Sequence, residues 1–311
     1  NRAIGAPINI WNDHSDSLSM RDCGWLQLFA ETNQEALDLH IQAFRLAEEL
    51  SLPIMVCMDG FILTHAYERV DMPTQAQVDA YLPKYEPRQV LDPNDPVSMG
   101  AMVGPEAFME VRYLAHAKQM QALELLPGYA AEFKAVFGRE SGGLLHSYRL
   151  DGAETVIIAM GSVLGTIKDT VDELREAGHA IGVLGITCFR PFPMAAVASA
   201  LAHCKRFVVL EKSLAVGVGG ILAVNVRMAV TGMGLLGYTV IAGLGGRAIT
   251  KRSLRAMLLQ AEQDQLERTT FLDLDWKAVN KQLEREKAQR RSGPVAEALL
   301  RDAGVVAARN Y

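Results

Sequence analysis

The sequence predicts an α/β protein in which helices cover parallel sheets. Between residues 146 and 262, short apolar runs alternate several times with segments of helical length, a pattern typical of parallel strands joined by helices. A second region, Pro53–Met58, is a continuous apolar run, as expected of a strand buried on both faces of a sheet. The length of 311 residues predicts two domains.

The first segment, residues 1–70, combines a polar loop with one helix and the strand just named. Thr32-Asn33-Gln34-Glu35 is predicted to be a capping box. The Thr32 side chain would accept from the Glu35 amide, and the Glu35 side chain would reach back to the Thr32 amide. Apolar residues then recur at helical spacing, at Leu37, Ile41, Phe44 and Ala47. Pro53 ends this helix, and Asp59-Gly60 closes the strand.

Residues 71–145 are predicted to form a connection followed by one helix. Six of the twelve prolines lie between positions 71 and 105, and their fixed φ angles and missing amide protons exclude a long helix or a central strand there. We therefore expect an extended segment that passes over surfaces. A helix follows from about Pro105 to Phe137.

The second domain, residues 146–265, is predicted to be a helix-covered parallel sheet. Its expected strands are Thr155–Met160, Ala180–Thr187, Arg206–Leu210 and Tyr238–Ala242. Helices are expected after Gly161-Ser162, over Pro193–Ala202, after the glycine loop Gly217–Gly220 and, as the last element of the domain, over Leu254–Ala261. The first of these helices ends at Gly178, because glycine readily adopts positive φ.

The tail, residues 266–311, is polar and predicted to be helical from Asp275 onward. Within Lys277–Arg291, six basic and two acidic residues give a net charge of 6 − 2 = +4. Such a run indicates either a solvated helix face or an arm that packs on an acidic partner subunit.

Composition excludes several classes of protein. With 50% hydrophobic and 22% charged residues, the chain is not disordered, collagen-like or a disulfide scaffold. A formal net charge of −5 argues against a dedicated nucleic-acid binder. The four cysteines show no pairing pattern and no secretory signal precedes them, which predicts reduced thiols in a cytoplasmic protein. No apolar run approaches the roughly 18–20 residues of a membrane helix.

The polar loop near the start is the first candidate site. Arg2 could hold a substrate carboxylate through two parallel charge-assisted hydrogen bonds. Asn12, Asp13 and His14 are candidates for the lip of a pocket or for an interface. The alternative is that these acidic residues only brace loops through Asx turns. The spacing of His14 and its neighbouring carboxylates does not suit a transition-metal site, so no metal is predicted there.

A glycine motif near the end of the second domain is the other candidate. Gly243–Ala248 matches G-x-G-x-x-A, one form of the dinucleotide fingerprint, and follows a predicted strand. However, the match closes a sheet instead of opening one. We therefore favour a tight turn with close backbone packing here, and the same interpretation for Gly217–Gly220.

Several segments closely resemble the alpha subunit of pyruvate:ferredoxin oxidoreductases. The longest and most specific is Asn1–Asp16. The resemblance continues through Arg21–Trp25, Asn33–Ala36 with Asp38, and Met58–His65. Later segments resemble that subunit's second domain, which is similar to the carboxy-terminal domain of transketolases: Met160–Ser162 with Gly165 and Thr166, Phe189–Pro193, and Ala242–Arg247. The similarity covers about residues 1–265.

This resemblance implies the arrangement of domains. An incomplete thiamine-diphosphate-binding-type domain would precede a transketolase-C-terminal-like domain, with residues 1–70 as the carboxy-terminal part of the first, pyrimidine-side domain. The sequence begins at Asn1 without a methionine. The family's substrate-contacting threonine and the glutamate that activates the aminopyrimidine lie upstream of this point. We therefore expect that the front of a longer chain is missing or is supplied by another polypeptide.

The resemblance also implies a reaction and its participants. Pyruvate would be oxidatively decarboxylated with coenzyme A to acetyl-CoA and CO2, and electrons would pass to ferredoxin or flavodoxin. Thiamine diphosphate with Mg2+ would be shared with a beta subunit, and iron–sulfur clusters would lie only in partner subunits, among them a ferredoxin-like subunit. A gamma-type subunit would complete the complex. Arg2 falls on the family's arginine that holds the substrate carboxylate, and no residue is assigned as catalytic with certainty.

Other functions stay open at this point. The same chemistry could act on another 2-oxoacid, such as 2-oxoglutarate or a branched-chain acid. The chain could also be a non-catalytic assembly subunit that retains the fold as a scaffold. A dinucleotide-dependent oxidoreductase, using Gly243–Ala248, is the remaining alternative.

Overall fold

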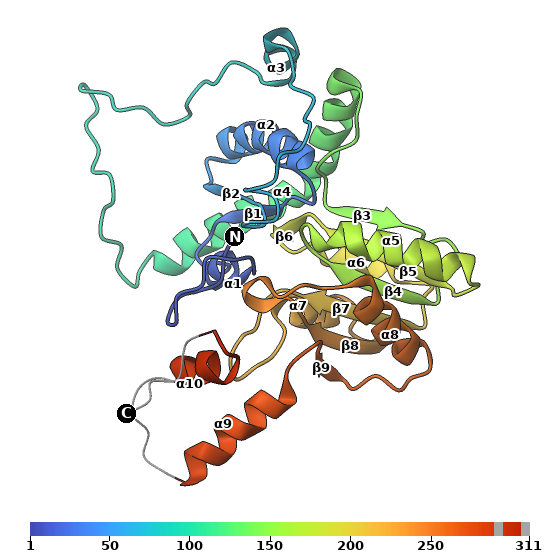
Figure 1. Cartoon of the computed structure of the whole chain (residues 1–311). Helices are drawn as coiled ribbons and strands as arrows, with labels where there is room; N and C mark the ends of the chain where they lie inside the picture. The colour runs from blue at the N-terminus through green and yellow to red at the C-terminus, as the bar shows by residue number, and fades with distance from the viewer. Residues whose placement is uncertain (289–294, 306–311) are drawn as a thin grey trace.

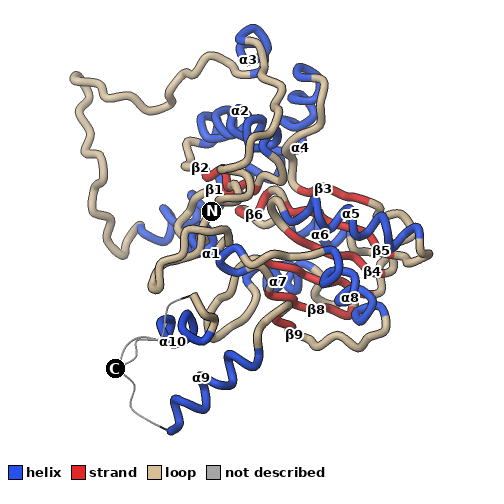
Figure 2. The backbone as a smooth tube through the Cα atoms, viewed as in Figure 1, coloured by secondary structure: helices blue, strands red, loops and turns tan. Residues whose placement is uncertain are grey.

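The computed structural model describes residues 1–288 and 295–305, which form two sheets with helices on their faces (Figures 1 and 2). The first sheet has three strands in the order β2-β1-β6. The second has six strands in the order β3-β5-β4-β7-β8-β9. The predicted α/β class is confirmed.

The first sheet is built around one helix. Strand β1 (Leu26–Phe29) runs parallel to β2 (Ile54–Cys57), and the connecting helix α2 (Asn33–Leu50) packs on both β2 and α4. Strand β6 (Cys188–Arg190) pairs antiparallel with β1, although in the sequence it lies between two strands of the second sheet. The chain therefore passes from the second sheet into the first sheet at β6, which links the two sheets directly.

The start of α2 differs in one detail from the predicted capping box. The Thr32 hydroxyl accepts from the Glu35 amide at 3.1 Å, as expected. The Glu35 carboxylate instead accepts from the Glu31 amide at 2.7 Å, so the second half of the prediction is wrong by one residue. The other oxygen of this carboxylate lies 2.8 Å from His146 Nε2, so both oxygens have partners other than the Thr32 amide.

The connection contains a short helix and a long exposed segment. Helix α3 (Gln75–Tyr81) begins with a complete capping box between Thr74 and Gln77. Residues 83–103 are all exposed and stand away from the body, so this segment is extended as expected but does not pass over the surface of its own chain (Figure 1). We call residues 83–107 the arm. The predicted helix after it is confirmed as α4 (Phe108–Phe137).

The second sheet carries helices on both faces. Its central strands are β5 (Ile181–Ile186), β4 (Thr155–Ala159), β7 (Arg206–Glu211) and β8 (Leu236–Ile241), all parallel. Helices α5 (Val163–Glu176) and α8 (Lys251–Glu262) cover one face; α6 (Met194–Ala200) and α7 (Ile221–Ala229) cover the other (Figure 2). Alternate residues of β4 pack into the two cores, as a two-sided buried strand requires.

The edges of this sheet were not predicted. Strand β3 (Leu145–Tyr148) pairs antiparallel with β5 at one edge. Strand β9 (Thr269–Phe271) pairs parallel with β8 at the other, so α8 is not the last element of the domain as expected. Both strands are too short to leave a clear periodicity in the sequence.

After β9, the described part of the tail consists mainly of two helices. Helices α9 (Trp276–Ala288) and α10 (Val295–Asp302) are joined by ion pairs from Lys281 and Arg285 to Asp302. The predicted basic run extends to Arg291, and its last part lies outside the described residues. None of the described helices is both long enough and apolar enough to cross a membrane.

Candidate functional site

The polar loop near the start lies where the two sheets meet, and we call this region the junction. Asn12, Asp13 and His14 are only 0–4% exposed. The Gly246 amide donates to the Asn12 carbonyl at 2.7 Å, and the His14 amide donates to the Lys212 carbonyl at 2.7 Å. These three residues thus form an internal interface between the amino-terminal loop and the second sheet.

Asp59, directly after β2, is the centre of the junction. Its carboxylate lies 2.8 Å from His14 Nε2 and accepts from Lys212 Nζ at 3.1 Å. It also accepts from the Ser162 amide at 2.9 Å and the Ser162 hydroxyl at 2.5 Å. One fully buried carboxylate therefore binds donors from the amino-terminal loop, the turn after β4 and the end of β7.

The electrostatics of this cluster favour the ionised form of Asp59 despite its burial. Burial alone would raise the pKa of Asp59, but the charge and hydrogen bond of His14 and the ammonium group of Lys212 hold that pKa well below its usual range. Burial lowers the pKa of Lys212, and the Asp59 charge opposes this shift. An ion pair this well satisfied fixes the position of the segments that carry it.

Sequence reasoning did not identify this cluster. Asp59 and Lys212 are 153 residues apart, and Lys212 lies in none of the segments singled out from the sequence. A signal was nevertheless present, since Asp59, Ser162 and Lys212 each follow a predicted strand. The carboxyl ends of parallel strands are where polar side chains of α/β proteins gather.

The glycine motif is a close-packed turn, and the interpretation favoured from the sequence is confirmed. The Gly245 amide donates to Asp13 Oδ2 at 3.1 Å, so it is not free for a phosphate. A Cβ atom at Gly246 would lie 2.6 Å from Trp11 Cβ. These glycines allow the amino-terminal loop to approach the second sheet closely.

The second glycine loop, Gly217–Gly220, also packs against a side chain of this chain. The buried Glu211 carboxylate accepts hydrogen bonds from the amides of Ile221, Leu222 and Ala223 at the start of α7. A Cβ atom at Gly220 would collide with this carboxylate. The place that a phosphate takes in a dinucleotide site is therefore filled by a side chain of the chain.

Arg2 has a fixed backbone and an exposed side chain. The Arg2 amide donates to Asp16 Oδ2 at 3.0 Å, and the next amide, Ala3, donates to the Trp11 carbonyl at 3.0 Å. Among the described residues, none forms a hydrogen bond or ion pair with the Arg2 guanidinium. Large apolar side chains nearby in the sequence are also exposed: Ile4, Ile8, Ile10 and Trp11.

The described residues contain a candidate carboxylate-binding group but no candidate metal centre. Within residues 1–288 and 295–305, no group of three or more His, Cys, Asp or Glu side chains could hold a metal ion. The guanidinium of Arg2, in contrast, has the planar donor pair that carboxylates bind. The junction therefore holds one exposed guanidinium on a rigidly bound backbone.

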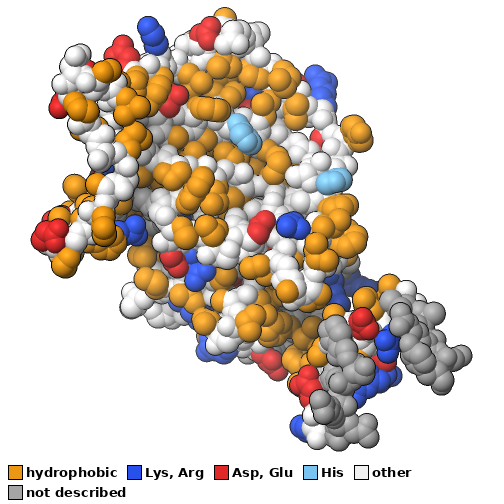
Figure 3. Space-filling view, turned by 90° about the vertical axis from the view of Figure 1, so that its left-hand side faces the viewer, with side chains coloured by type: hydrophobic (Ala, Val, Ile, Leu, Met, Phe, Trp, Pro, Cys, Tyr) orange, Lys and Arg blue, Asp and Glu red, His pale blue; other side chains and the backbone are white. Residues whose placement is uncertain are grey.

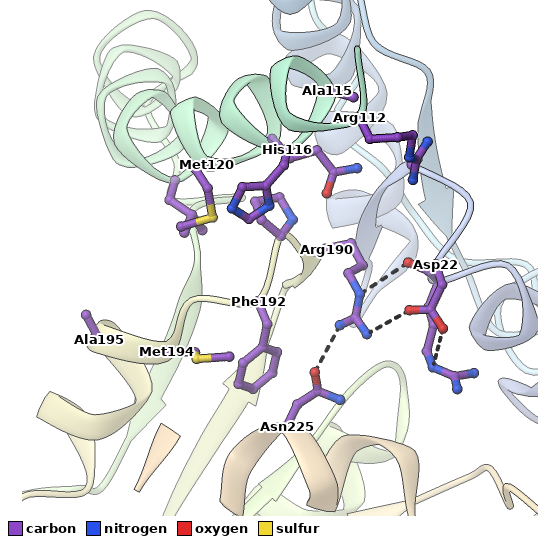
Figure 4. Close-up of a pocket in the computed structure, with 15 residues that line it drawn as sticks. Asp22, Arg112, Ala115, His116, Met120, Arg190, Phe192, Met194, Ala195 and Asn225 are labelled. Atoms are coloured by element: carbon purple, nitrogen blue, oxygen red, sulfur yellow. Dashed lines mark hydrogen bonds and ion pairs between the residues drawn. The ribbon is translucent and has the colours of Figure 1, made fainter. Parts of the chain in front are cut away.

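A separate cavity of about 560 Å3 lies between α4, the turn before β1 and the start of α6, and we call it the slot (Figure 4). Arg112, Arg190 and Asp22 lie at one end of it, and Met120, Phe192 and Met194 at the other. Arg190 donates to the Arg21 carbonyl at 3.2 Å and to Asn225 Oδ1 at 3.1 Å. Burial lowers the pKa of Arg190.

Two protein-family models match the chain. "Pyruvate flavodoxin/ferredoxin oxidoreductase, thiamine diP-bdg" matches residues 1–129, and "Pyruvate:ferredoxin oxidoreductase core domain II" matches residues 153–254. The two sheets and their order along the chain are thus those of a 2-oxoacid:ferredoxin oxidoreductase, with a thiamine-diphosphate-binding domain followed by core domain II.

Sequence comparison with individual proteins identifies the subunit within this family. The chain is 43% identical over 270 residues to "Pyruvate synthase subunit PorA" of Methanosarcina barkeri, covering 85% of this chain and 67% of that one. It is 40% identical to the PorA subunit of Methanothermobacter thermautotrophicus (84% and 68%). It is 36% identical to "Ketoisovalerate oxidoreductase subunit VorA" of Pyrococcus horikoshii (83% and 66%). The chain belongs to the PorA family, the alpha subunits of pyruvate synthase, and is one subunit of a multisubunit enzyme.

A solved structure supports the fold. The 2-oxoglutarate:ferredoxin oxidoreductase from Magnetococcus marinus, with 2-oxoglutarate, coenzyme A and succinyl-CoA bound, matches with a TM-score of 0.54 and 16% identity. The match covers 86% of this chain and 47% of the other. At this identity the likeness concerns the arrangement of sheets and helices alone.

Proposed function

We propose that the chain is the alpha subunit of a pyruvate:ferredoxin oxidoreductase acting in the cytoplasm. The complex oxidatively decarboxylates pyruvate with coenzyme A to acetyl-CoA and CO2, and passes two electrons to ferredoxin or flavodoxin. The support for pyruvate is that the PorA subunits above are 40–43% identical to the chain, whereas the VorA subunit is 36% identical.

The proposed complex divides the work between subunits. A beta subunit binds most of the thiamine diphosphate and its Mg2+, and ferredoxin-like and gamma-type subunits complete the assembly, with the iron–sulfur clusters in partner subunits. When bound, thiamine diphosphate supplies the nucleophilic carbon that attacks the keto group of a 2-oxoacid.

Within this division, Arg2 binds the carboxylate of pyruvate. Its exposed guanidinium, unpaired among the described residues, is the observation that carries this assignment. Backbone hydrogen bonds to Asp16 and Trp11 hold the segment on both sides of the side chain. The Gly60 amide donates to the Asn1 carbonyl at 2.8 Å, which ties Arg2 to the rigid Asp59 loop. A substrate held in a fixed orientation reacts faster than one that is free to rotate.

The test replaces Arg2 in the purified complex. We expect Arg2→Lys to raise the KM for pyruvate at least roughly tenfold, because an ammonium group cannot form two parallel hydrogen bonds to a carboxylate. The thiamine diphosphate content should not change. Arg252→Lys, on the exposed start of α8, is the matched control and should leave the KM unchanged. Normal pyruvate kinetics in both Arg2→Lys and Arg2→Gln would refute the role of Arg2.

A branched-chain 2-oxoacid is the second candidate substrate, because the VorA relative is nearly as similar as the PorA relatives. The ratio of kcat/KM values for pyruvate, 2-oxoisovalerate and 2-oxoglutarate separates these functions. A complex with iron–sulfur clusters that turns over none of them would instead indicate a scaffold subunit.

A further inference from the structure

The arm is the most exposed part of the described chain. It is held to the body by the ion pair between Arg88 and Glu49 at 2.7 Å, before its central part begins. From residue 89 to 103, no described residue forms a hydrogen bond or ion pair with the rest of the chain. Its one internal structure there is the turn between Asp92 and Asp95. Within its own chain, the central part of the arm therefore has no surface on which it packs.

The chemistry of the arm is that of a docking segment. Residues 89–107 contain three acidic and no basic residues, a net charge of 0 − 3 = −3. Its apolar side chains are 39–98% exposed: Val90, Leu91, Val97, Met99, Met102 and Val103. A solvated linker of this length does not need six large apolar groups, since their exposure to water is unfavourable.

The slot has the complementary chemistry. Its lining includes three arginines and one acidic residue, a net charge of 3 − 1 = +2. The Arg112 guanidinium has no hydrogen bond or ion pair among the described residues and lies at the cationic end (Figure 4). The other end is apolar. The slot thus suits a segment that carries acidic and apolar side chains close together, as Leu91-Asp92 and Asp95-Pro96-Val97 do.

We propose that the arm of one copy of this chain lies in the slot of a second copy, and that the second copy's arm returns the contact. Two complementary features on one chain that do not meet within it form two identical contacts when two copies pair about a twofold axis. The first turns of α4 would extend the interface, because they join the arm to the slot and expose Phe108, Met109 and Tyr113. Figure 3, which views the side on which the arm lies in Figure 1, shows apolar side chains spread across this face.

A native cysteine beside the slot allows the contact between arm and slot to be tested by cross-linking. Cys23 is the exposed cysteine among the four and lies between Asp22 and Gly24, which both line the slot. We introduce Val90→Cys, Ser98→Cys or Met102→Cys on the arm, one at a time, in the intact complex, and add a short bismaleimide without oxygen. Cross-linked peptides are then identified by mass spectrometry.

The expected product joins the arm cysteine of one copy to Cys23 of another. To establish that two copies take part, two differently tagged chains are co-expressed. One carries Ser98→Cys together with Cys23→Ser, and the other keeps both native residues. A covalent species that carries both tags supports the proposal. The proposal is overturned if the arm cysteine links to Cys23 only within one chain, links to another subunit, or links to nothing at all three positions.

Charge reversal tests the complementarity. We expect Asp92→Lys with Asp95→Lys to lower the cross-linking yield roughly tenfold at low salt, because like charges then meet at the slot. Arg112→Glu in the other copy should restore most of the yield, and Arg252→Glu on α8, the matched control, should restore none. Equal restoration by both, or no loss at the start, would overturn the assigned pairing.

Discussion

In the junction, the fully buried Asp59 carboxylate has donors from three separate segments of the chain, whereas in the arm every residue from 83 to 103 is exposed. Both regions are rich in charged groups and both come from connections between regular elements. The junction satisfies its groups inside the chain and so fixes the geometry of one subunit. Between residues 89 and 103 the arm makes no hydrogen bond or ion pair with the rest of the described chain and exposes its apolar side chains, as a surface does that another molecule covers.

The largest expected effect is on the junction. Asp59→Asn should lower the free energy of unfolding by about 3–5 kcal/mol, because it leaves the Lys212 ammonium group buried without its counter-charge. Urea unfolding followed by tryptophan fluorescence measures the change. Asp71→Asn, which removes an exposed partner of Arg69, is the matched control and should cost less than about 1 kcal/mol. Equal losses in the two variants would contradict the view that the junction fixes the fold.

The pH dependence of that effect follows from the low pKa of Asp59. A carboxyl group with a lowered pKa in the folded state stabilises the fold above its unfolded pKa, about 3.9. This stabilisation is lost as the pH falls through the folded pKa. The difference between the native chain and Asp59→Asn should therefore stay constant between neutral pH and about pH 5, and shrink only in stronger acid.

Prediction from the sequence succeeded for elements with a local pattern and failed for contacts between distant residues. Helices α2 and α5 and strands β4, β5 and β7 were predicted because their periodicity is local and a few neighbouring residues determine it. Strand β6 has only three residues and directly follows β5, so no turn signal announces it. The Asp59 cluster depends on contacts across 45 to 153 residues, which no local pattern encodes.

A smaller effect is expected where the two sheets meet through His146 and Glu35. The hydrogen bond to Glu35 raises the pKa of His146, and burial opposes this shift. A histidine with a raised pKa stabilises the fold below its unfolded pKa, about 6.5, and this contribution is lost as the pH rises through the folded value. We expect His146→Gln to cost roughly 1 kcal/mol at pH 6 and less at pH 9. A cost that increases with pH would contradict the assignment.

The smallest effect on stability is expected in the arm, and a pair of methionines measures it directly. Met102 is 98% exposed on the arm, and Met257 is 2% exposed in the core between α8 and the second sheet. Met257→Ala should cost about 2–5 kcal/mol, because it removes buried apolar surface and leaves a cavity. Met102→Ala should change the free energy of unfolding of the isolated chain by less than about 0.5 kcal/mol. If the arm docks on a second copy, the same substitution should weaken association between copies, as measured by the concentration at which they separate. A loss of stability in the isolated chain would show instead that the arm packs on its own body, and the contrast between the two regions would fail.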